Sequence, residues 1–306
     1  MFDNGSISND VLKEVILGLT SRPQPLARLF CTVKEGRQGL IGKVPYLTSA
    51  TSLGSTGNGR VGQAPGSDIS SHQGALAYAD YDCKQYGGRV DLAHASVISL
   101  DAFDFDAMGE FLQFAMAQSA VLCDTDLATV LASASLNNTF DCNSVGGGEW
   151  NTADGTPLTD LDKIRTNGSY AKGADTVIMG VTAWSEFRAN PQVIGRVATS
   201  NSTLLTDSEA QALLAGFGYR NIYIYDQALN TADDGLALSI SDVFATGVWA
   251  GHKSDLIMVS PRHALNGEAQ AEKVPGAPRS ILTYVEYADF VRPHKEMGCR
   301  LTNVLE

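Results

Sequence analysis

The residues that most often carry out chemistry in proteins are sparse and scattered in this chain. Its five histidines fall at positions 72, 94, 252, 263 and 294, and none forms HExxH, HxH or another spacing typical of metal ligands. The sequence also lacks the GxSxG turn of a serine hydrolase and the GxxxxGK(S/T) loop that binds phosphates. We therefore predict no catalytic residue, no metal site and no bound cofactor, and hence a protein that is not an enzyme.

Two short motifs resemble binding sites but lack the sequence context that such sites require. Gly57, Gly59 and Gly62 match GxGxxG, yet a dinucleotide site needs this pattern between a buried strand and a helix. Here Ser, Thr and Gly precede the motif and Ala-Pro-Gly follows it. The acids of Asp233-Asp234-Gly235 lack the alternating ligand spacing of a calcium loop. We interpret the first motif as loop glycines and the second as a solvated turn.

The composition indicates a protein whose surface meets other subunits. Hydrophobic residues make up 44% of the 306 residues and charged residues only 18%, and interface cores are depleted in charge. An ordinary enzyme with a large core would give the same composition. The net charge of −12 argues against binding nucleic acid by phosphate neutralisation, although residues 1–60 hold seven basic and only four acidic side chains.

The cysteines and the apolar runs indicate in which cellular compartment the protein lies. The five cysteines are scattered without a CxxC pair, which indicates a reducing compartment and predicts neither a disulfide framework nor a zinc site. The N-terminus lacks a basic region followed by an apolar run, and no apolar run approaches the length of a membrane span. We expect no signal peptide and no contact with a membrane.

The longest helical pattern of the chain runs from Asp101 to Ser135, without a proline. We predict one long helix, capped by Asp101, which bends or divides, if anywhere, at Gly109 or at Asp124-Thr125-Asp126. Six acids and no base make it a poor nucleic-acid helix. Its apolar and small residues recur at intervals of mostly three and four, at Met108, Phe111, Leu112, Ala115, Ser119, Leu122, Leu127, Val130 and Leu131.

The chain before this helix reads as extended. Residues 9–20 form a short amphipathic helix, either docked on its own core or packed on a neighbour as an arm. Residues 38–50 and 75–99 both resemble long strands, and residues 52–71 between them are rich in Gly and Ser. A structureless loop of that length is improbable inside a compact domain. We predict a projecting hairpin and, because an isolated hairpin is marginal in water, a neighbouring subunit that covers it.

The chain after this helix alternates between helices and strands. A helix opens at Pro157-Leu158-Thr159, and Thr182 is expected to cap a second helix that stops at Asn190-Pro191. A capping box begins a third helix at Thr206, and Gly216 closes it. Residues 228–237 read as a turn-rich loop. Strands are predicted at 174–180, 221–226, 242–251 and 255–260, and a long β-prone run begins at 280.

This order of parts resembles the major capsid protein of tailed double-stranded DNA phages, which has the Hong Kong 97-type fold. The segment ADTVIMGVTAWSEFRANPQV (174–193) resembles the strand and helix that open the axial domain of that family. YDCKQYGGRVDLAHASVISLDAF (81–103) resembles the return strand of its extended loop, and QPLARLF (24–30) resembles its arm.

The resemblance implies an α+β chain divided as in that family. It predicts an N-terminal arm at 1–35, an extended β-hairpin loop at 36–98 and an axial domain at 156–256. The peripheral domain with the long spine helix would take residues 99–155 and 257–306.

The resemblance also implies a function and partners. The chain would self-assemble into hexamers and pentamers of an icosahedral shell that encloses double-stranded DNA without sequence-specific binding. Assembly would occur in the host cytoplasm and end in the virion, with a separate scaffolding protein, a portal and a possible decoration protein as partners. By position alone, the assembly interface would include Gly57, Gly59, Arg60 and Val61 at the loop tip and Asn230, Asp233 and Asp234 near the capsomer axis.

Two other functions stay open on the sequence. A cellular nanocompartment shell, or encapsulin, would share the fold and differ by enclosing an enzyme cargo. A soluble α/β enzyme built on residues 155–256 would instead be a monomer with one deep polar pocket. The type member of the phage family crosslinks its subunits through lysine, but Lys43 and Lys84 are the only lysines of the loop region and neither lies at its tip.

Overall fold

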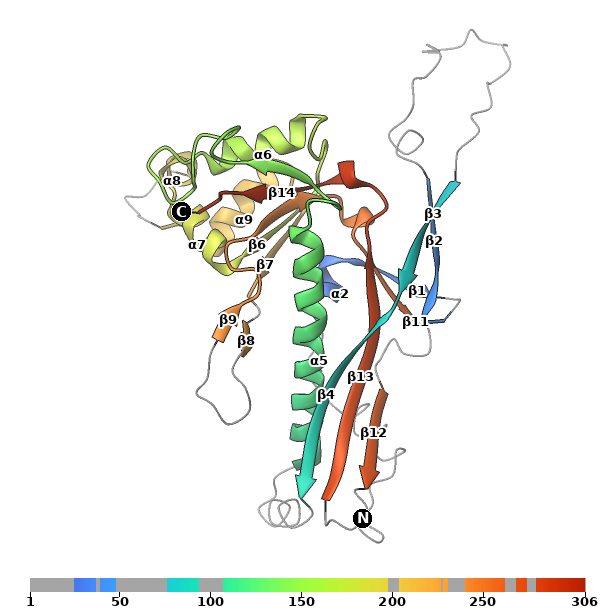
Figure 1. Ribbon diagram of the computed structural model, residues 1–306. Coiled ribbons are helices and arrows are strands. Elements are labelled where there is room, and N and C mark those ends of the chain that lie inside the picture. The colour runs from blue at the N-terminus through green and yellow to red at the C-terminus, as the bar shows by residue number, and fades with distance from the viewer. Residues whose placement is uncertain are drawn as a thin grey trace, which may run out of the picture.

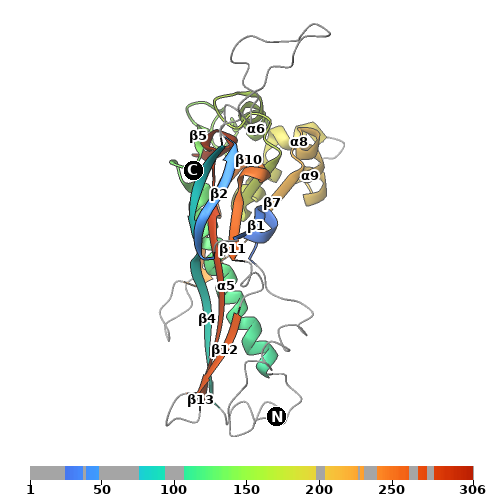
Figure 2. The same cartoon turned by 90° about the vertical axis from the view of Figure 1, so that its right-hand side faces the viewer.

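The computed structural model describes the larger part of the chain. The described residues are 25–36, 39–47, 76–93, 107–197, 204–226, 228–230, 240–261, 268–273 and 279–305. Two five-stranded sheets form the body of the molecule, and a long helix runs down one face of the first (Figure 1). Helices α8 (Pro191–Val197) and α9 (Asp207–Gly216), which pack on the second sheet, lie on the opposite side of the molecule from β2 (Ile41–Leu47) and β4 (Lys84–Ala93) (Figure 2).

The first sheet is built around one long strand. Strand β13 (Arg279–Val291) pairs antiparallel with β4 (Lys84–Ala93) on one edge and with β12 (Glu268–Lys273) and β11 (Ile257–Pro261) on the other. Strand β1 (Thr32–Gly36) then adds parallel to β11. The long β-prone run predicted from residue 280 thus forms the central strand of this sheet, and it pairs with strands from both the N-terminal and the C-terminal half of the chain.

Helix α5 (Ala107–Ala132) is the predicted spine helix, and it packs on β4 and β13. It runs unbroken through Gly109 and Asp124, the two positions where a bend seemed possible. It ends before the predicted Ser135, because the side chain of Asn137 donates to the carbonyls of Val130 and Leu131 and so caps its last turn. Residues 101–106 lie outside the described residues.

The buried stripe of α5 only partly matches the predicted one: Phe111 and Val130 are half-buried, and Met116 and Cys123 are buried although they were not predicted. Leu122 was expected to face the core, but 43% of it is exposed. The stripe that meets the sheet instead runs through Leu112, Ala115, Met116, Ser119, Cys123, Leu127 and Leu131. Small residues at Ala115 and Ser119 let α5 approach the sheet closely, and the Ser119 hydroxyl donates to the carbonyl of Tyr86 on β4 at 3.0 Å.

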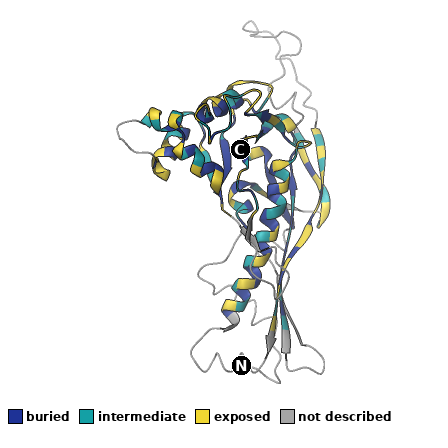
Figure 3. Cartoon of the chain, turned by 60° about the vertical axis from the view of Figure 1, so that its left-hand side comes forward, coloured by how far each residue is buried: buried dark blue, intermediate teal, exposed yellow. Residues whose placement is uncertain are grey.

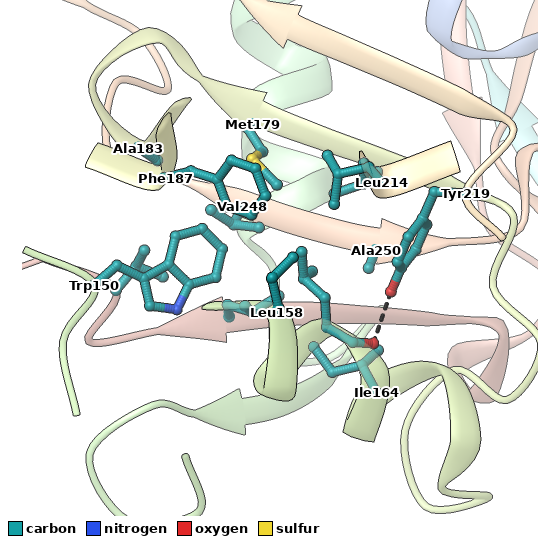
Figure 4. Close-up of a cluster of buried hydrophobic side chains, with 14 of the residues drawn as sticks. Trp150, Leu158, Ile164, Met179, Ala183, Phe187, Leu214, Tyr219, Val248 and Ala250 are labelled. Atoms are coloured by element: carbon teal, nitrogen blue, oxygen red, sulfur yellow. Dashed lines mark hydrogen bonds between the residues drawn. The ribbon is translucent and has the colours of Figure 1, made fainter. Parts of the chain in front are cut away.

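The second sheet has the order β5 (Asn138–Asp141), β14 (Gly298–Thr302), β10 (Val248–Gly251), β6 (Thr176–Gly180) and β7 (Asn221–Tyr225). Helices α6 (Pro157–Thr166), α7 (Val181–Ala189), α8 (Pro191–Val197) and α9 (Asp207–Gly216) pack on it. Trp150, Phe187, Met179 and Leu214 meet in their shared core, where the Tyr219 hydroxyl donates to the carbonyl of Leu161 (Figure 4).

The local predictions for this unit fared differently. The capping box at Thr206 and Glu209 is present, and α9 ends at Gly216 as expected. Helix α7, however, takes Gly180 as its N-cap and not Thr182. The predicted strand 242–251 is wrong at its centre: β9 (Ile240–Asp242) ends before a turn, and β10 begins at Val248. The carbonyl of Phe244 in that turn lies so close to Gly180 that a Cβ there would meet it at 1.8 Å.

Two hairpins leave this body. Strands β2 (Ile41–Leu47) and β3 (Leu76–Asp82) pair antiparallel over their full length, and Cys83 separates β3 from β4. Strand β8 (Ala228–Asn230) pairs with β9 and forms the second hairpin where a turn-rich loop was predicted. The short helix α2 (Ala27–Phe30) and the helical turns Lys253–Asp255 and Lys295–Met297 complete the described elements.

Candidate assembly surface

The inner face of the β2–β3 hairpin is held by the first sheet. Val44, Tyr81 and Cys83 pack in one cluster with Ile257, Val259 and Val291 of β11 and β13. Further along, the Tyr46 ring meets the His294 ring edge-on, with ring centroids 5.0 Å apart. Burial raises the pKa of the Cys83 thiol to about 12, so this thiol stays protonated and packs as a small apolar group. The hairpin base is therefore a fixed part of the molecule.

The outer face of the hairpin is exposed and largely apolar. Because cross-strand partners share a face, the register Lys43 to Asp80 and Pro45 to Tyr78 places these residues opposite the inner cluster. Ile41 is 68% exposed and Tyr78 58%, whereas Lys43 and Asp80 form an ion pair at 3.6 Å in the same row. We define the outer face as Ile41, Lys43, Pro45, Leu76, Tyr78 and Asp80, all of them exposed.

A second exposed apolar row lies on the spine helix. Phe114 is 56% exposed and Leu122 is 43% exposed, and they lie two turns apart on one side of α5. Exposed residues of α5 stand beside buried ones along its length (Figure 3). Scattered apolar residues are normal on a protein surface, but two ordered rows, one on a hairpin that leaves the body and one along the long helix, are typical of an interaction surface.

Substitution on the two faces of the hairpin should separate assembly from folding. Ile41→Ser and Tyr78→Ser on the outer face should leave the unfolding midpoint of the unassembled chain unchanged. Each should raise the concentration needed for self-association about tenfold or more, because covering such a side chain is worth about 1.5–3 kcal/mol. The matched inner-face variant Val44→Ser should instead lower the unfolding midpoint. Light scattering measures self-association, and urea unfolding measures the unfolding midpoint. Self-association of the outer-face variants at the same concentration as the native chain would contradict the assignment of the outer face to assembly.

Two buried carboxylates that the sequence analysis missed hold residues 25–36, at the end of the predicted arm, against the first sheet and its helix α5. Asp124 of α5 accepts hydrogen bonds from the backbone N–H groups of Leu26 and Ala27 at 3.0 and 2.9 Å. Glu286 of β13 pairs with Arg28 at 2.9 Å. Desolvation by burial raises the pKa of both carboxyl groups, that of Asp124 to about 6. A carboxylate at an otherwise apolar position of the helical pattern was the only sequence signal for this contact.

The raised pKa of Asp124 predicts a pH dependence of stability. A carboxyl group with a pKa of about 6 in the folded chain and 3.8 as its ordinary value stabilises the fold fully below pH 3.8. That contribution is lost as the pH rises through 6. The unfolding free energy of the native chain, relative to an Asp124→Asn variant, should therefore fall by about 3 kcal/mol between acidic and neutral pH. Urea unfolding of the native protein and of Asp124→Asn across this pH range measures the difference in unfolding free energy. A difference that does not change with pH would contradict the prediction.

The interface residues predicted by position lie mostly outside the described residues. These are Gly57, Gly59, Arg60, Val61, Asp233 and Asp234. Asn230 ends β8, opposite Ile240 of β9. The described residues hold no group of three or more His, Cys, Asp and Glu that would suit a metal ion, and no helix among them is long and apolar enough to cross a membrane.

Comparison with known proteins gives a likeness in structure alone. No protein-family model and no curated protein matches the sequence. A phage-related protein from Bordetella bronchiseptica superposes with a TM-score of 0.66 at 15% identity, covering 96% of each chain. The capsid of Myoviridae phage XM1 gives 0.52 at 12% identity, covering 97% of this chain and 96% of that one. The encapsulin of Synechococcus elongatus gives 0.53 at 10% identity, covering 98% and 96%.

These likenesses span nearly the whole chain and include both sheets and the long helix. They show that the chain has the Hong Kong 97-type fold, the α+β architecture predicted from the order of its parts.

Proposed function

We propose that this chain is the major capsid subunit of a tailed double-stranded DNA phage. It self-assembles into hexamers and pentamers of an icosahedral shell that encloses the genome. The observation that carries the proposal is the β2–β3 hairpin, whose inner face is packed while its outer face exposes Ile41 and Tyr78. A protein with the fold of a shell subunit and an ordered, uncovered apolar face has the surface that assembly requires.

In this proposal, the outer face of one subunit lies over the spine helix of the next, near Phe114 and Leu122. The tip with Gly57, Gly59, Arg60 and Val61 extends the same contact, and the loop with Asn230, Asp233 and Asp234 lines the capsomer axis. The division into arm, extended loop, peripheral domain and axial domain is proposed on the same basis. Strands β5 and β14, from segments assigned to the peripheral domain, complete the second sheet beside the strands assigned to the axial domain.

The proposed shell has further partners and no catalytic role. A separate scaffolding protein, a portal and a possible decoration protein act with it in the host cytoplasm, and the finished chain resides in the virion. A net charge of −12 suits a container that releases its DNA freely. Subunits are expected to stay uncrosslinked, since Lys84 is engaged by Asp126 at 2.7 Å and Lys43 by Asp80.

The second candidate is a nanocompartment shell, and the likeness to an encapsulin favours it. Electron microscopy of the purified chain tests both, because either function requires closed shells, and a monomer at every concentration would contradict both. The contents then decide between them. Shells isolated from the cells that produce them should hold double-stranded DNA and a portal if the first proposal is right, and an enzyme cargo if the second is.

A further inference from the structure

We propose that helix α2 is a detachable wedge that sets the angle between the two sheets. When it is seated, the sheets hold one relative orientation; when the arm segment withdraws it, they turn about a pivot at Arg292. This device goes beyond the proposed shell function, because it describes how the state of the arm is passed to the rest of the subunit. The argument rests on which elements the wedge contacts and on what else joins the sheets.

One side of the wedge is tied to the first sheet and its helix. The α2 N-terminus is held by the carboxylate of Asp124 on α5, which receives two backbone N–H groups. The guanidinium of Arg28 reaches the carboxylate of Glu286 on β13, and the Tyr284 hydroxyl donates to the same Glu286 oxygen at 2.9 Å. The bonds from Asp124 and Glu286 to α2 and its N-cap connect residues more than 90 positions apart, so they exist only while α2 is seated.

The other side of the wedge is tied to the second sheet. The Phe30 ring packs on Tyr223 and Tyr225 of β7, with ring centroids 4.8 and 5.9 Å apart. Lys253 lies in the turn that joins β10 to β11, and hence one sheet to the other. Its ammonium group donates to the carbonyl of Leu29 at 2.8 Å and to the Tyr223 hydroxyl at 2.7 Å. A negative group at the N-terminus of α2 and a positive group at its C-terminus match the polarity of a helix.

The pivot lies at the C-terminal end of α5, where directional bonds also join the sheets, among them the bond from the Arg300 guanidinium of β14 to the carbonyl of Ala132 at 2.5 Å. Arg292, just after β13, donates to Asn137 at the end of α5 and lies over the Trp249 ring of β10 at 5.2 Å. Between pivot and wedge, the contact consists mainly of apolar side chains such as Cys123, Leu127 and Ile178. The hydroxyl of Tyr225 also donates to the backbone oxygen of Asp124. Asp124 therefore binds both the N-terminus of α2, through its carboxylate, and β7, through its backbone. Apolar burial is not directional, so it permits rotation once the wedge leaves.

The buried cysteines provide a readout of wedge release. Cys31 at the end of α2 and Cys123 beside Asp124 are buried in the cluster that includes the wedge, whereas Cys142 and Cys299 are buried in the core of the second sheet. Burial raises the pKa of the Cys31 and Cys123 thiols, so neither reacts while α2 is seated. Alkylation of the full chain, mapped by mass spectrometry, reports on both regions at once.

The variants remove the two end contacts of α2. Asp124→Leu deletes both acceptors, Asp124→Asn keeps one, and Lys253→Met deletes both donors; Lys295→Met, at an exposed lysine away from the wedge, is the matched control. We expect alkylation of Cys31 and Cys123 to accelerate about tenfold or more in Asp124→Leu and Lys253→Met, less in Asp124→Asn and not in Lys295→Met. Cys142 and Cys299 should stay protected throughout, which also shows that the variants fold.

A distance measurement tests the rotation itself. In the chains made for this measurement Cys31 and Cys123 are replaced by alanine, and the other three native cysteines are buried, so spin labels attach selectively to Gln85→Cys on β4 and Ser208→Cys on α9, both exposed positions, even where the wedge is released. The distance distribution should be narrow in the native chain and in Lys295→Met, and broader or displaced where Cys31 reacts. An unchanged distribution in a variant with reactive Cys31 would overturn the proposal, as would unchanged alkylation in Lys253→Met. Reactive Cys142 and Cys299 in Asp124→Leu would show that this variant is unfolded. In that case the measurements on Lys253→Met and Asp124→Asn test the proposal.

Discussion

Replacing Gly88 by alanine should destabilise the protein by at least about 3 kcal/mol or prevent it from folding. Gly88 lies on β4 where α5 crosses it, and a Cβ at this position would lie 1.9 Å from the backbone oxygen of Ala115 and 2.5 Å from its carbonyl carbon. Neither atom can move aside by changing a rotamer, because both belong to the helix backbone. Relief would require the whole helix to shift away from the sheet, and that shift would open the buried seam between α5 and β4.

The neighbouring residue supplies a matched control. A Cβ on Gly87 would point to the other side of the strand, where the nearest atom is the backbone oxygen of Tyr284 at 3.5 Å, an ordinary contact distance. Gly87→Ala should therefore be neutral or slightly stabilising. Urea unfolding followed by tryptophan fluorescence, together with the soluble yield of each variant, compares the two. Similar stability of both variants would show that α5 does not approach the sheet as closely as the structure indicates.

Arg292→Met should cost about 3–5 kcal/mol of stability, because it breaks a buried network and leaves the Asp255 carboxylate without its cation. The Arg292 guanidinium is fully buried and pairs with Asp255 at 3.0 Å, a carboxylate whose side chain is only 4% exposed. It also donates to the carbonyl of His294 at 3.0 Å and to Asn137. Asn137 in turn accepts from the Trp249 indole N–H at 2.7 Å and caps α5. The variant would leave the Asp255 charge unpaired in a desolvated site.

The same substitution at an exposed ion pair provides the comparison. Lys84 pairs with Asp126 at 2.7 Å, but the lysine side chain is 63% exposed. Lys84→Met should therefore change stability by about 1 kcal/mol or less, since solvent screens the pair. A small effect of Arg292→Met in the same unfolding assay would mean that the network is dispensable, and it would also remove the pivot from the proposed rotation of the sheets.

Much of the local structure follows directly from the sequence. The capping box at Thr206, the helix from Pro157 and the uninterrupted apolar strand at 176–180 depend on interactions within a few residues, and they form as predicted. The order of these elements, together with the glycine-rich stretch between two strand patterns, was enough to indicate the fold. The apolar row on the hairpin was also visible as strand material, because alternation assigns alternate residues to opposite faces.

Other features depend on residues that are distant in sequence, and only the tertiary structure decided them. The step Asp124-Thr125-Asp126 was a place where the long helix could bend or divide, but α5 runs through it. The N–H groups of Leu26 and Ala27, nearly 100 positions away, satisfy the buried carboxylate of Asp124. The exposure of Leu122, the turn inside residues 242–251 and the Arg292 network have the same origin. The sequence alone determined most of the helices and strands and their order, because short-range hydrogen bonds and periodicity encode them. Which faces meet and which charges are buried depended on the assembled fold, because those energies arise only when remote segments come into contact.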